Sequence, residues 1–531
     1  MLDPIYDECG IAAVYEMDPG RVESVVPLLP EMLMDLQNRG QLAAGIASFN
    51  EARAQVLDSY KDVGSVNDVF HLTLPDPSRY QKILKEYSGR AGIGHVRYAT
   101  CGRDDPSYAQ PFERHHGRRW KWFSFCFNGN VANFREVRSS LIDKGYHLVR
   151  DTDTELIMHH LSYALREENK PDVLTVFGHL AEVIDGAFSL AFLNADGDMV
   201  LARDPQGFRP LCYGTKGSLF AAASESLALA NRGFTEIHDL EPGELIHVAP
   251  GQYPDGFKVH RFAPAKRKSF CFFEYVYFAN VASKINGRSV YLTRSRLGEA
   301  LAQSETVPTD PADCVVVPVP DTAKAACDAM AYKLGIPSHE GLMRNRYLGR
   351  TFIEGRNRMD VARRKYTALP EVLEGKKVFL VEDSIVRSTT LRVIINMLRT
   401  SGRAKEIHVR VACPPIMAPC AYGIDMSTVR ELFAPKHLEK PTRGVLPEDE
   451  LARATADLGA DSLRYLTVEE LVQSIGLPEN ELCLACLTGS YPSPWGEKMY
   501  AEALCRRDEP EAVRTYERLE EADASASPSN P

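Results

Sequence analysis

The chain has 531 residues, which is too long for one hydrophobic core, so two or three domains are expected. Its composition, 44% hydrophobic and 25% charged, is typical of a soluble globular protein, and its net charge of −10 argues against a general nucleic-acid binder. The acidic start does not predict a signal peptide, no apolar run approaches membrane-spanning length, and the twelve scattered cysteines fit a cytoplasmic enzyme better than a secreted disulfide framework.

Residues 9–250 are expected to form a layered α+β domain. Short β-rich runs such as CGIAAVYE and GAFSLAFLN are broken by Gly and Asn, and helical stretches such as TELIMHHLSYALREE lie between them. Residues 251–312 are a connecting segment with an amphipathic helix near YLTRSRLGEALAQ. From 313 to 495, strands alternate with helices, which predicts an α/β domain with a parallel sheet. Residues 496–531 begin as a charged helix and end in a composition typical of disorder.

The segment Val378–Thr390 has the sequence VFLVEDSIVRSTT, in which an apolar run is followed by two adjacent acids and a turn rich in Ser and Thr. This order predicts a buried parallel strand, a phosphate-sized loop and a helix N-terminus. Backbone N–H groups at such a turn hold a phosphate. The carboxylates of Glu382 and Asp383 can hold sugar hydroxyls or Mg²⁺. An ordinary strand–loop–helix unit with acids at the strand end has the same pattern.

Val378–Thr390 resembles the phosphoribosyl pyrophosphate (PRPP) loop of type I phosphoribosyltransferases, and together with CPPIMAPCAYGID it resembles the glutamine PRPP amidotransferases. Nearer the N-terminus, CGIAAV, LQNRGQLAAGI, GHVRYATCG, NGNVANF, DTDTE and ARDPQGFRPL follow the motif order of N-terminal-nucleophile (Ntn) glutamine amidotransferases. The resemblance covers about residues 9–495. It implies a four-layer αββα Ntn-hydrolase domain, a type 2 glutamine amidotransferase, at 9–250. It also implies a phosphoribosyltransferase domain and cluster-binding segment at 313–495.

The family implies an enzyme that converts glutamine, PRPP and water to 5-phosphoribosylamine, glutamate and pyrophosphate, the first step of purine biosynthesis. Ammonia would pass between two sites. A paralogue that aminates a different phosphorylated sugar and a non-catalytic, nucleotide-sensing relative are the alternatives. The family also implies purine nucleotides as inhibitors and a homotetramer or dimer. We expect no nucleic-acid or membrane partner.

Cys9 lies directly before the first expected strand. On its own, a buried Cys is usually a small hydrophobe. The resemblance implies instead that a leader, residues 1–8, is removed so that Cys9 becomes the first residue. The freed α-amino group, whose unperturbed pKa is about 7.7–8.0, then serves as the base for its own thiol. The thiolate attacks the amide carbon of glutamine, and ammonia is released.

Four further residues are assigned to the glutamine site by the same motif matches. Arg97 is expected to pair with the α-carboxylate of glutamine, and Asp153 to bind its ammonium group. The Asn128 side chain and the Gly129 backbone N–H are expected to form an oxyanion hole. From the residues alone, Arg97 could form a core salt bridge and Asp153 a helix cap. Asn128-Gly129 could be a turn.

The resemblance places Mg²⁺ and PRPP around Thr322, Glu382 and Asp383. The residues expected to bind PRPP are Asp383, Ser384, Ile385, Val386, Arg387, Ser388, Thr389 and Thr390. The basic segment 344–370 resembles a mobile loop that closes over PRPP, with Arg and Lys side chains to meet the pyrophosphate. A solvated surface loop has the same composition.

Several positions depart from the family pattern. Ser388 stands where the family has Gly, which is a cost if the position needs φ > 0, although its hydroxyl could add a donor. Phe127 stands where His usually precedes NGN, and Asn38 and Leu42 occur in NRGQL where the family has HRGQE. FANVAS at 278–283 replaces a form close to FARPDS. The changes at Ser388 and 278–283 motivate the paralogue hypothesis.

Cys483 and Cys486 form a C-x-x-C pair, which alone fits a zinc half-site, a redox pair or chance. Cys271 and Cys420 occupy the other two positions that bind a [4Fe–4S] cluster in members of the resembled family. The resemblance therefore favours a structural [4Fe–4S] cluster, with zinc second.

Overall fold

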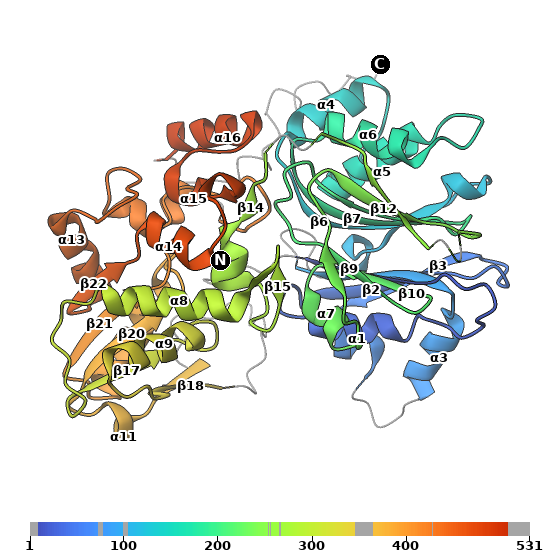
Figure 1. Ribbon diagram of the computed structural model, residues 1–531. Helices are drawn as coiled ribbons and strands as arrows, with labels where there is room; N and C mark the ends of the chain where they lie inside the picture. The colour runs from blue at the N-terminus through green and yellow to red at the C-terminus, as the bar shows by residue number, and fades with distance from the viewer. Residues whose placement is uncertain are drawn as a thin grey trace, which may run out of the picture. The chain divides into compact units, whose positions relative to one another are not determined.

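The computed structural model describes residues 9–72, 78–98, 105–252, 254, 256–264, 267–345, 365–426 and 428–507 (Figure 1). Within these ranges the chain forms two compact units. The first unit contains residues 9–270, 420–428 and 491–507, and the second contains residues 271–419 and 429–490. The expected leader, the part of the basic segment at 346–364 and the expected disordered tail beyond residue 507 lie outside the described residues.

The first unit is built on two antiparallel sheets. Within the described ranges, the larger sheet has the order β11-β9-β10-β1-β4-β2-β3, and the smaller has the order β13-β12-β8-β7-β6-β5. The strands of the larger sheet are β1 (Gly10–Glu16), β2 (Ala43–Phe49), β3 (Leu57–Val63), β4 (Ala91–Arg97), β9 (Cys212–Lys216), β10 (Leu219–Ala223) and β11 (Ile237–Asp239). Those of the smaller sheet are β5 (Phe112–Arg114), β6 (Phe123–Val131), β7 (Gly186–Asn194), β8 (Met199–Arg203), β12 (Glu244–Val248) and β13 (Lys258–Arg261).

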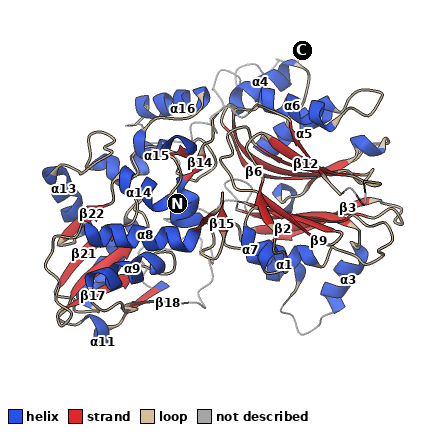
Figure 2. Cartoon of the chain, viewed as in Figure 1, coloured by secondary structure: helices blue, strands red, loops and turns tan. Residues whose placement is uncertain are grey.

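Helices cover the outer face of each sheet and give this unit four layers (Figure 2). On β1, Ile11, Ala13 and Tyr15 lie in the core between the two sheets. Ala12 and Val14 face the helices of the larger sheet. Those helices are α1 (Leu28–Asp35), α2 (Val66–Phe70), α3 (Ser78–Glu86) and α7 (Ser226–Ala230), and the smaller sheet carries α4 (Phe134–Asp143), α5 (Asp153–Ala164) and α6 (Val173–Val183). The predicted αββα arrangement is confirmed.

The second unit contains the predicted parallel sheet, in the order β17-β20-β21-β22. Its strands are β17 (Cys314–Pro318), β20 (Lys377–Glu382), β21 (Glu406–Val411) and β22 (Ser462–Tyr465), and a small antiparallel pair is formed by β18 (Leu342–Arg344) and β19 (Tyr366–Ala368). Its helices are α8 (Val290–Gln303), α9 (Lys324–Leu334), α11 (Pro370–Leu373), α12 (Thr389–Thr400), α13 (Glu448–Leu458), α14 (Val468–Ile475) and α15 (Ala485–Thr488). The buried apolar run of β20 is central in the sheet, so the loop that follows it opens at the carboxyl edge.

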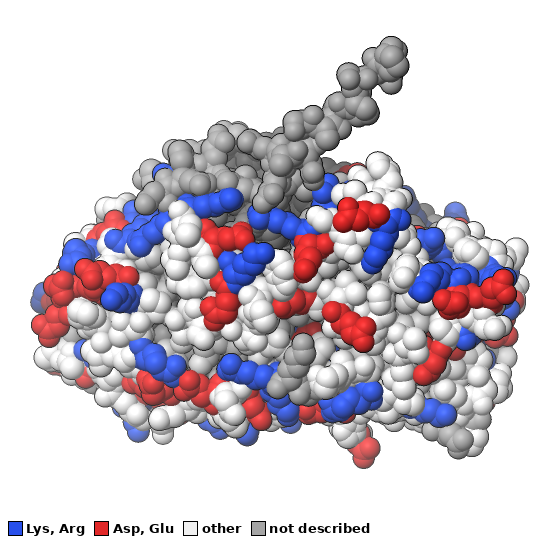
Figure 3. Space-filling view, turned by 90° about the horizontal axis from the view of Figure 1, so that it is seen from above, with Lys and Arg blue, Asp and Glu red and all other residues white. Residues whose placement is uncertain are grey.

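The connecting segment expected at 251–312 is divided between the two units. Strand β13 extends the smaller sheet of the first unit beyond residue 250, whereas α8 packs with α9 in the second unit. Helix α16 (Pro494–Cys505) belongs to the first unit. None of the described helices has the length and apolar character needed to cross a membrane. On the face shown in Figure 3, the described Lys and Arg residues are interspersed with Asp and Glu.

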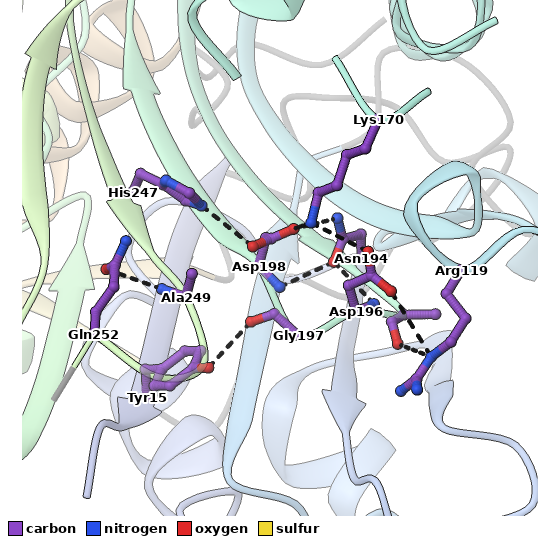
Figure 4. A network of polar contacts seen from close by, with 11 residues as sticks. Tyr15, Arg119, Lys170, Asn194, Asp196, Gly197, Asp198, His247, Ala249 and Gln252 are labelled. Atoms are coloured by element: carbon purple, nitrogen blue, oxygen red, sulfur yellow. Dashed lines mark hydrogen bonds and ion pairs between the residues drawn. The ribbon is translucent and has the colours of Figure 1, made fainter. Parts of the chain in front are cut away.

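The turn between β7 and β8 is held by a polar network around Asp198 (Figure 4). Asn194 Nδ2 donates to Asp198 Oδ2 at 2.9 Å, and Lys170 Nζ donates to the same oxygen. His247 Nε2 lies 3.3 Å from Asp198 Oδ1. Tyr15 Oη donates to Gly197 O at 3.1 Å, which ties the turn to β1. The network thus joins both sheets at this end of the unit.

Candidate functional site

Neighbouring strands of the first unit present candidate residues to the layer between the sheets. Side chains alternate along a strand, and Ile11 of β1, Ile93 of β4 and Cys126 of β6 all pack in this layer. The same alternation places three candidate residues on it: Cys9, Arg97 and Asn128. Strands β1 and β4 pair antiparallel, with Gly10 opposite Val96, so the start of β1 lies beside the end of β4.

Cys9 is partly buried immediately before β1. Its Sγ is 3.8 Å from Tyr98 O, to which the thiol donates. Burial raises the pKa of the Cys9 thiol, while the nearby charges of Arg97 and Arg39 act in the opposite direction. The thiol is therefore protonated at neutral pH and needs a base before it can act as a nucleophile.

Arg97 is buried at the end of β4, with its guanidinium carbon 5.6 Å from the centroid of the Tyr108 ring. The close approach of the NRGQL segment to this strand end requires a glycine. A Cβ added at Gly40 would lie 2.6 Å from the carbonyl carbon of Arg97. The motif glycine therefore allows the backbone to pass against Arg97.

Asn128 and Gly129 lie within strand β6, so the alternative of a turn at these residues is wrong. Asn128 is 2% exposed, and within the described residues its Nδ2 has no hydrogen-bond partner. A Cβ on Gly129 would lie 1.8 Å from Ala187 O, so that residue must be glycine for β6 and β7 to pair. A buried amide without a partner is costly, and this donor is available to an oxygen of a bound substrate.

The backbone of Phe127, just before Asn128, is held by two side chains that the sequence did not single out. Gln110 Oε1 accepts from Phe127 N at 2.7 Å, and Gln110 Nε2 donates to Phe127 O at 3.2 Å. His95 Nε2 lies 3.2 Å from the same carbonyl oxygen. Burial lowers the pKa of His95 to about 3, so the ring is neutral and we assign its proton to Nε2. The His95 contact joins β4 to β6, and Gln110 joins the segment before β5 to β6.

Asp153 is the first residue of α5, but it does not cap the helix. The Thr152 side chain does so by accepting from Glu155 N at 3.4 Å. Asp153 Oδ2 instead accepts from Val131 N at 2.9 Å. The carboxylate is thus attached to the end of β6, three residues after Asn128. The thiol, guanidinium, amide donor and carboxylate of this site are groups suited to binding an amino acid and cleaving its side-chain amide.

A second constellation lies in the second unit, where β20 ends. Thr322 Oγ1 donates to Asp383 Oδ2, and Ser384 Oγ donates to Asp383 Oδ1 at 2.6 Å. Burial raises the pKa of Glu382, and the adjacent Asp383 charge raises it further. Burial also raises the pKa of Asp383, against the hydrogen bonds from Ser384 and Thr322. A partly buried and a buried carboxyl, adjacent in sequence and with a hydroxyl beside them, are hard oxygen donors, which fit Mg²⁺.

The loop after these acids leads into α12 through Ser388, which has φ 68° and ψ −12°. The position therefore does need φ > 0, and a non-glycine residue there costs about 1–3 kcal/mol. Ser388 is buried and makes no capping bond to α12. Residues 431–433 hold the loop instead. Phe433 N donates to Val386 O at 2.6 Å, and Arg387 forms an ion pair with Glu431 at 2.9 Å.

The cysteines expected to bind a cluster fall near the ends of short elements. Cys271 in β14 (Phe270–Cys271) and Cys483 in β23 (Leu482–Cys483) lie on paired strands. Cys486 O accepts from Met417 N at 2.8 Å. Cys420 Sγ accepts from Tyr422 N at 3.3 Å. Among the residues that the structure describes, no three His, Cys, Asp or Glu side chains form a group that could hold a metal ion.

Comparison with known proteins connects this geometry with one group of enzymes. A family model described as a glutamine amidotransferase domain matches residues 95–231. The chain is 39% identical over 497 residues to an amidophosphoribosyltransferase of Methanothermobacter thermautotrophicus, covering 92% of this chain and 95% of that protein. It is 34% identical to the amidophosphoribosyltransferase of Bacillus subtilis, covering 92% and 94%. The solved structure of the B. subtilis glutamine PRPP amidotransferase complexed with ADP and GMP matches with a TM-score of 0.77 at 34% identity, covering 91% of this chain and 97% of that one.

Proposed function

The chain belongs to the amidophosphoribosyltransferase family and is a glutamine-dependent enzyme of this kind, and we propose that Cys9 and the segment Glu382–Thr390 are its two reaction centres. The reaction converts glutamine, PRPP and water to 5-phosphoribosylamine, glutamate and pyrophosphate, the first step of purine biosynthesis. The observation that carries the proposal is the buried Nδ2 of Asn128, which has no partner among the described residues and which strand alternation places on the same layer as the Cys9 thiol. This amide can donate a hydrogen bond to the oxyanion that forms when the Cys9 thiolate attacks a substrate carbonyl in that layer.

Removal of residues 1–8 would make Cys9 the mature N-terminus. Because burial raises the pKa of the thiol, a base is required, and the α-amino group of Cys9 itself takes the proton. The thiolate then adds to the amide carbon of glutamine. Asn128 Nδ2 and Gly129 N–H donate to the oxyanion, ammonia leaves, and water hydrolyses the thioester to glutamate.

Arg97 and Asp153 select an amino acid over a simple amide. The planar guanidinium of Arg97 suits bidentate binding of the α-carboxylate. The carboxylate of Asp153, attached to the end of β6, suits the α-ammonium group. Opposite charges at these two positions orient the substrate so that its side-chain amide reaches Cys9.

At the second centre, Thr322, Glu382 and Asp383 would hold Mg²⁺. When bound there, Mg²⁺ supplies positive charge that stabilises the departing pyrophosphate. The loop residues Ser384–Thr390 bind the 5′-phosphate of PRPP at the start of α12, and Asp383 binds PRPP together with the Mg²⁺. Ammonia attacks C1 of the ribose as pyrophosphate leaves. Ammonia rather than ammonium is the nucleophile, so it must reach PRPP without release to solvent.

We also propose a structural [4Fe–4S] cluster on Cys271, Cys420, Cys483 and Cys486, with zinc as the second candidate. The C-x-x-C spacing and the pairing of β14 with β23 support it, but the described side chains do not assemble a group of three ligands. No step of the reaction depends on it. Iron and acid-labile sulfide near four of each per chain after anaerobic purification would support the cluster, and zinc without sulfide would replace it.

Three further properties are proposed from family membership. Purine nucleotides are proposed as inhibitors, because the B. subtilis structure is a complex with ADP and GMP. We propose a homo-oligomer, a tetramer or a dimer, and a cytoplasmic location. Nucleotide inhibition of the purified enzyme and its mass by light scattering would test the first two.

Release of pyrophosphate from PRPP by the purified protein tests the proposed function. With wild type, either glutamine or ammonium should support release. Cys9→Ala should lose release with glutamine and keep release with ammonium. No release from PRPP with either nitrogen donor would reject the function, and glutamine-dependent amination of another sugar phosphate would favour the paralogue.

A further inference from the structure

The segment Cys420–Thr428 belongs to the first unit, although residues on both sides of it belong to the second. Within the first unit it lies against the end of β6. Asn130 Nδ2 donates to Ala421 O at 2.9 Å, and Arg209 Nη2 donates to Tyr422 O. Asn130 and Arg209 are both buried. Two side chains of the first unit therefore bind consecutive carbonyl groups of this segment.

The backbone of the segment also lies close to the backbone of Gly129. A Cβ built on Gly423, whose φ is 105°, would lie 3.3 Å from the carbonyl carbon of Gly129 and 3.0 Å from Arg209 Nη2. On its other side, the Tyr422 ring stacks on Phe208, with ring centroids 4.0 Å apart and planes inclined by 19°. The segment is thus fixed independently of β6 and can support it.

We propose that Ala421–Gly423, named here the brace, holds β6 in the conformation in which Asn128 and Gly129 donate to the oxyanion. The proposal rests on the proposed function of these two residues. It makes Asn130 and Arg209 positioning residues for glutamine hydrolysis. Asn130 is two residues after Asn128 and on the same face of β6, so the Asn130–Ala421 bond fixes that face beside the oxyanion donor.

The brace acts on the transition state rather than on substrate binding. Oxyanion donors must lie within about 0.5 Å of the productive position, and a shift of about 1 Å can cost on the order of a hundredfold in rate. Arg97 and Asp153, which are proposed to bind glutamine, belong to β4 and α5 rather than to β6, and the bond from Val131 N to Asp153 lies beyond Asn130 at the end of the strand. Loosening the brace should therefore lower kcat for glutamine and leave its KM nearly unchanged.

The test compares Asn130→Ala, Gly423→Ala and Asn133→Ala in the full-length enzyme. Asn133→Ala is the matched control, because Asn133 is also buried and its side chain also binds the backbone, donating to Val183 O at 2.8 Å and accepting from Asp185 N at 2.9 Å. Gly423→Ala disturbs the brace from its own side, which keeps the test independent of any folding defect of Asn130→Ala. The readouts are pyrophosphate release with glutamine and with ammonium, and the rate of Cys9 alkylation by iodoacetamide.

We expect both brace variants to lose about 10- to 100-fold in kcat with glutamine. Their KM for glutamine should change less than about threefold, and ammonium-dependent release and Cys9 alkylation should stay within about twofold. Asn133→Ala should keep its kcat. The proposal is overturned if both brace variants keep the wild-type kcat, if Asn133→Ala falls equally, or if ammonium-dependent release falls with them. A wild-type enzyme that cannot use glutamine would overturn the underlying function as well.

Discussion

Arg39 and Glu225 form a fully buried ion pair, with Arg39 Nε 2.6 Å from Glu225 Oε1. Asn38 Nδ2 donates to the same carboxylate oxygen at 2.8 Å. Glu225 precedes α7, whereas Asn38 and Arg39 follow α1, so the pair joins two helices on the outer face of the larger sheet. The Arg39 charge also acts on the Cys9 thiol. The pair therefore stabilises the packing of the two helices and places a positive charge near the Cys9 thiol.

Glu225→Gln should destabilise the first unit by about 3 kcal/mol, because it leaves a buried guanidinium without its counter-charge. Urea unfolding followed by tryptophan fluorescence reports on this unit, since all three tryptophans lie in it: Trp120, Trp122 and Trp495. The control is Glu244→Gln, whose partner Arg261 is 47% exposed. That variant should lose less than about 1 kcal/mol. Equal losses of unfolding free energy in the two variants would contradict the claim that the buried pair contributes more than the exposed one.

Gly40→Ala should weaken glutamine binding, because the added methyl group would push on the backbone of Arg97. We expect KM for glutamine to rise at least about tenfold, with a stability loss of about 1–3 kcal/mol typical of overpacking. Steady-state kinetics with glutamine and with ammonium would measure it. Gly117→Ala is the control, since its added Cβ meets no described atom within 4 Å. An unchanged KM in Gly40→Ala would show that Arg97 does not set glutamine affinity.

Asn128→Ala should lower kcat with glutamine by about 10²- to 10³-fold, the usual cost of removing one oxyanion-hole donor. The loss of Nδ2 itself breaks no hydrogen bond among the described residues, because this donor has no partner there. Pyrophosphate release with ammonium should be unaffected. A comparable loss with ammonium would mean that Asn128 serves the fold rather than glutamine hydrolysis.

Ser388→Gly and Ser388→Val distinguish two possible requirements at this position, a backbone with positive φ and the hydroxyl of the side chain. Gly accepts φ 68° without strain, whereas a β-branched residue there is a genuine outlier. With ammonium as donor, Ser388→Gly should keep KM for PRPP within about threefold, and Ser388→Val should raise it at least about tenfold. If both variants raise KM equally, the hydroxyl rather than the backbone conformation is what PRPP requires.

The Asp198 network should make the first unit sensitive to acid. Burial acts to raise the pKa of Asp198, but hydrogen bonds from His247, Lys170 and Asn194 outweigh it and hold this pKa below its usual range. A depressed carboxyl pKa contributes stability above the unfolded value of about 3.9, and this stability is lost as the pH falls below it. The urea midpoint should therefore fall more steeply below about pH 4 in wild type than in Asp198→Asn. The control Asp196→Asn removes a carboxylate that also binds Lys170, but it leaves the Asp198 carboxylate and its contacts with His247 and Asn194 in place, so it should follow wild type.

Much of the fold followed from local patterns in the sequence. The runs at 9–16 and 186–194 form β1 and β7, the helical pattern after residue 153 forms α5, and the segment from Val378 forms β20, its loop and α12. The departure at Ser388 raised the question of whether this position needs φ > 0, and the structure shows that it has φ 68°. Strand β13 was not expected, because it is a short and mostly exposed edge strand without apolar alternation.

The parts of the site that local patterns could not reveal are contacts between distant segments. Gln110 binds the backbone of Phe127, and a backbone partner leaves no residue signature. Asn130 binds Ala421 across 291 positions of sequence. The NGN motif contains Asn130, so its presence was visible, but its partner depends on the tertiary fold. Thr152 rather than Asp153 caps α5, since both residue types suit a cap and only packing decides between them.

The most direct test of the account is the ratio of glutamate to pyrophosphate released by the wild-type enzyme supplied with glutamine, PRPP and Mg²⁺. Coupled hydrolysis and transfer predict one glutamate for each pyrophosphate, with neither product formed at that rate when the other substrate is withheld. Glutamate release that continues without consumption of PRPP would contradict the central claim.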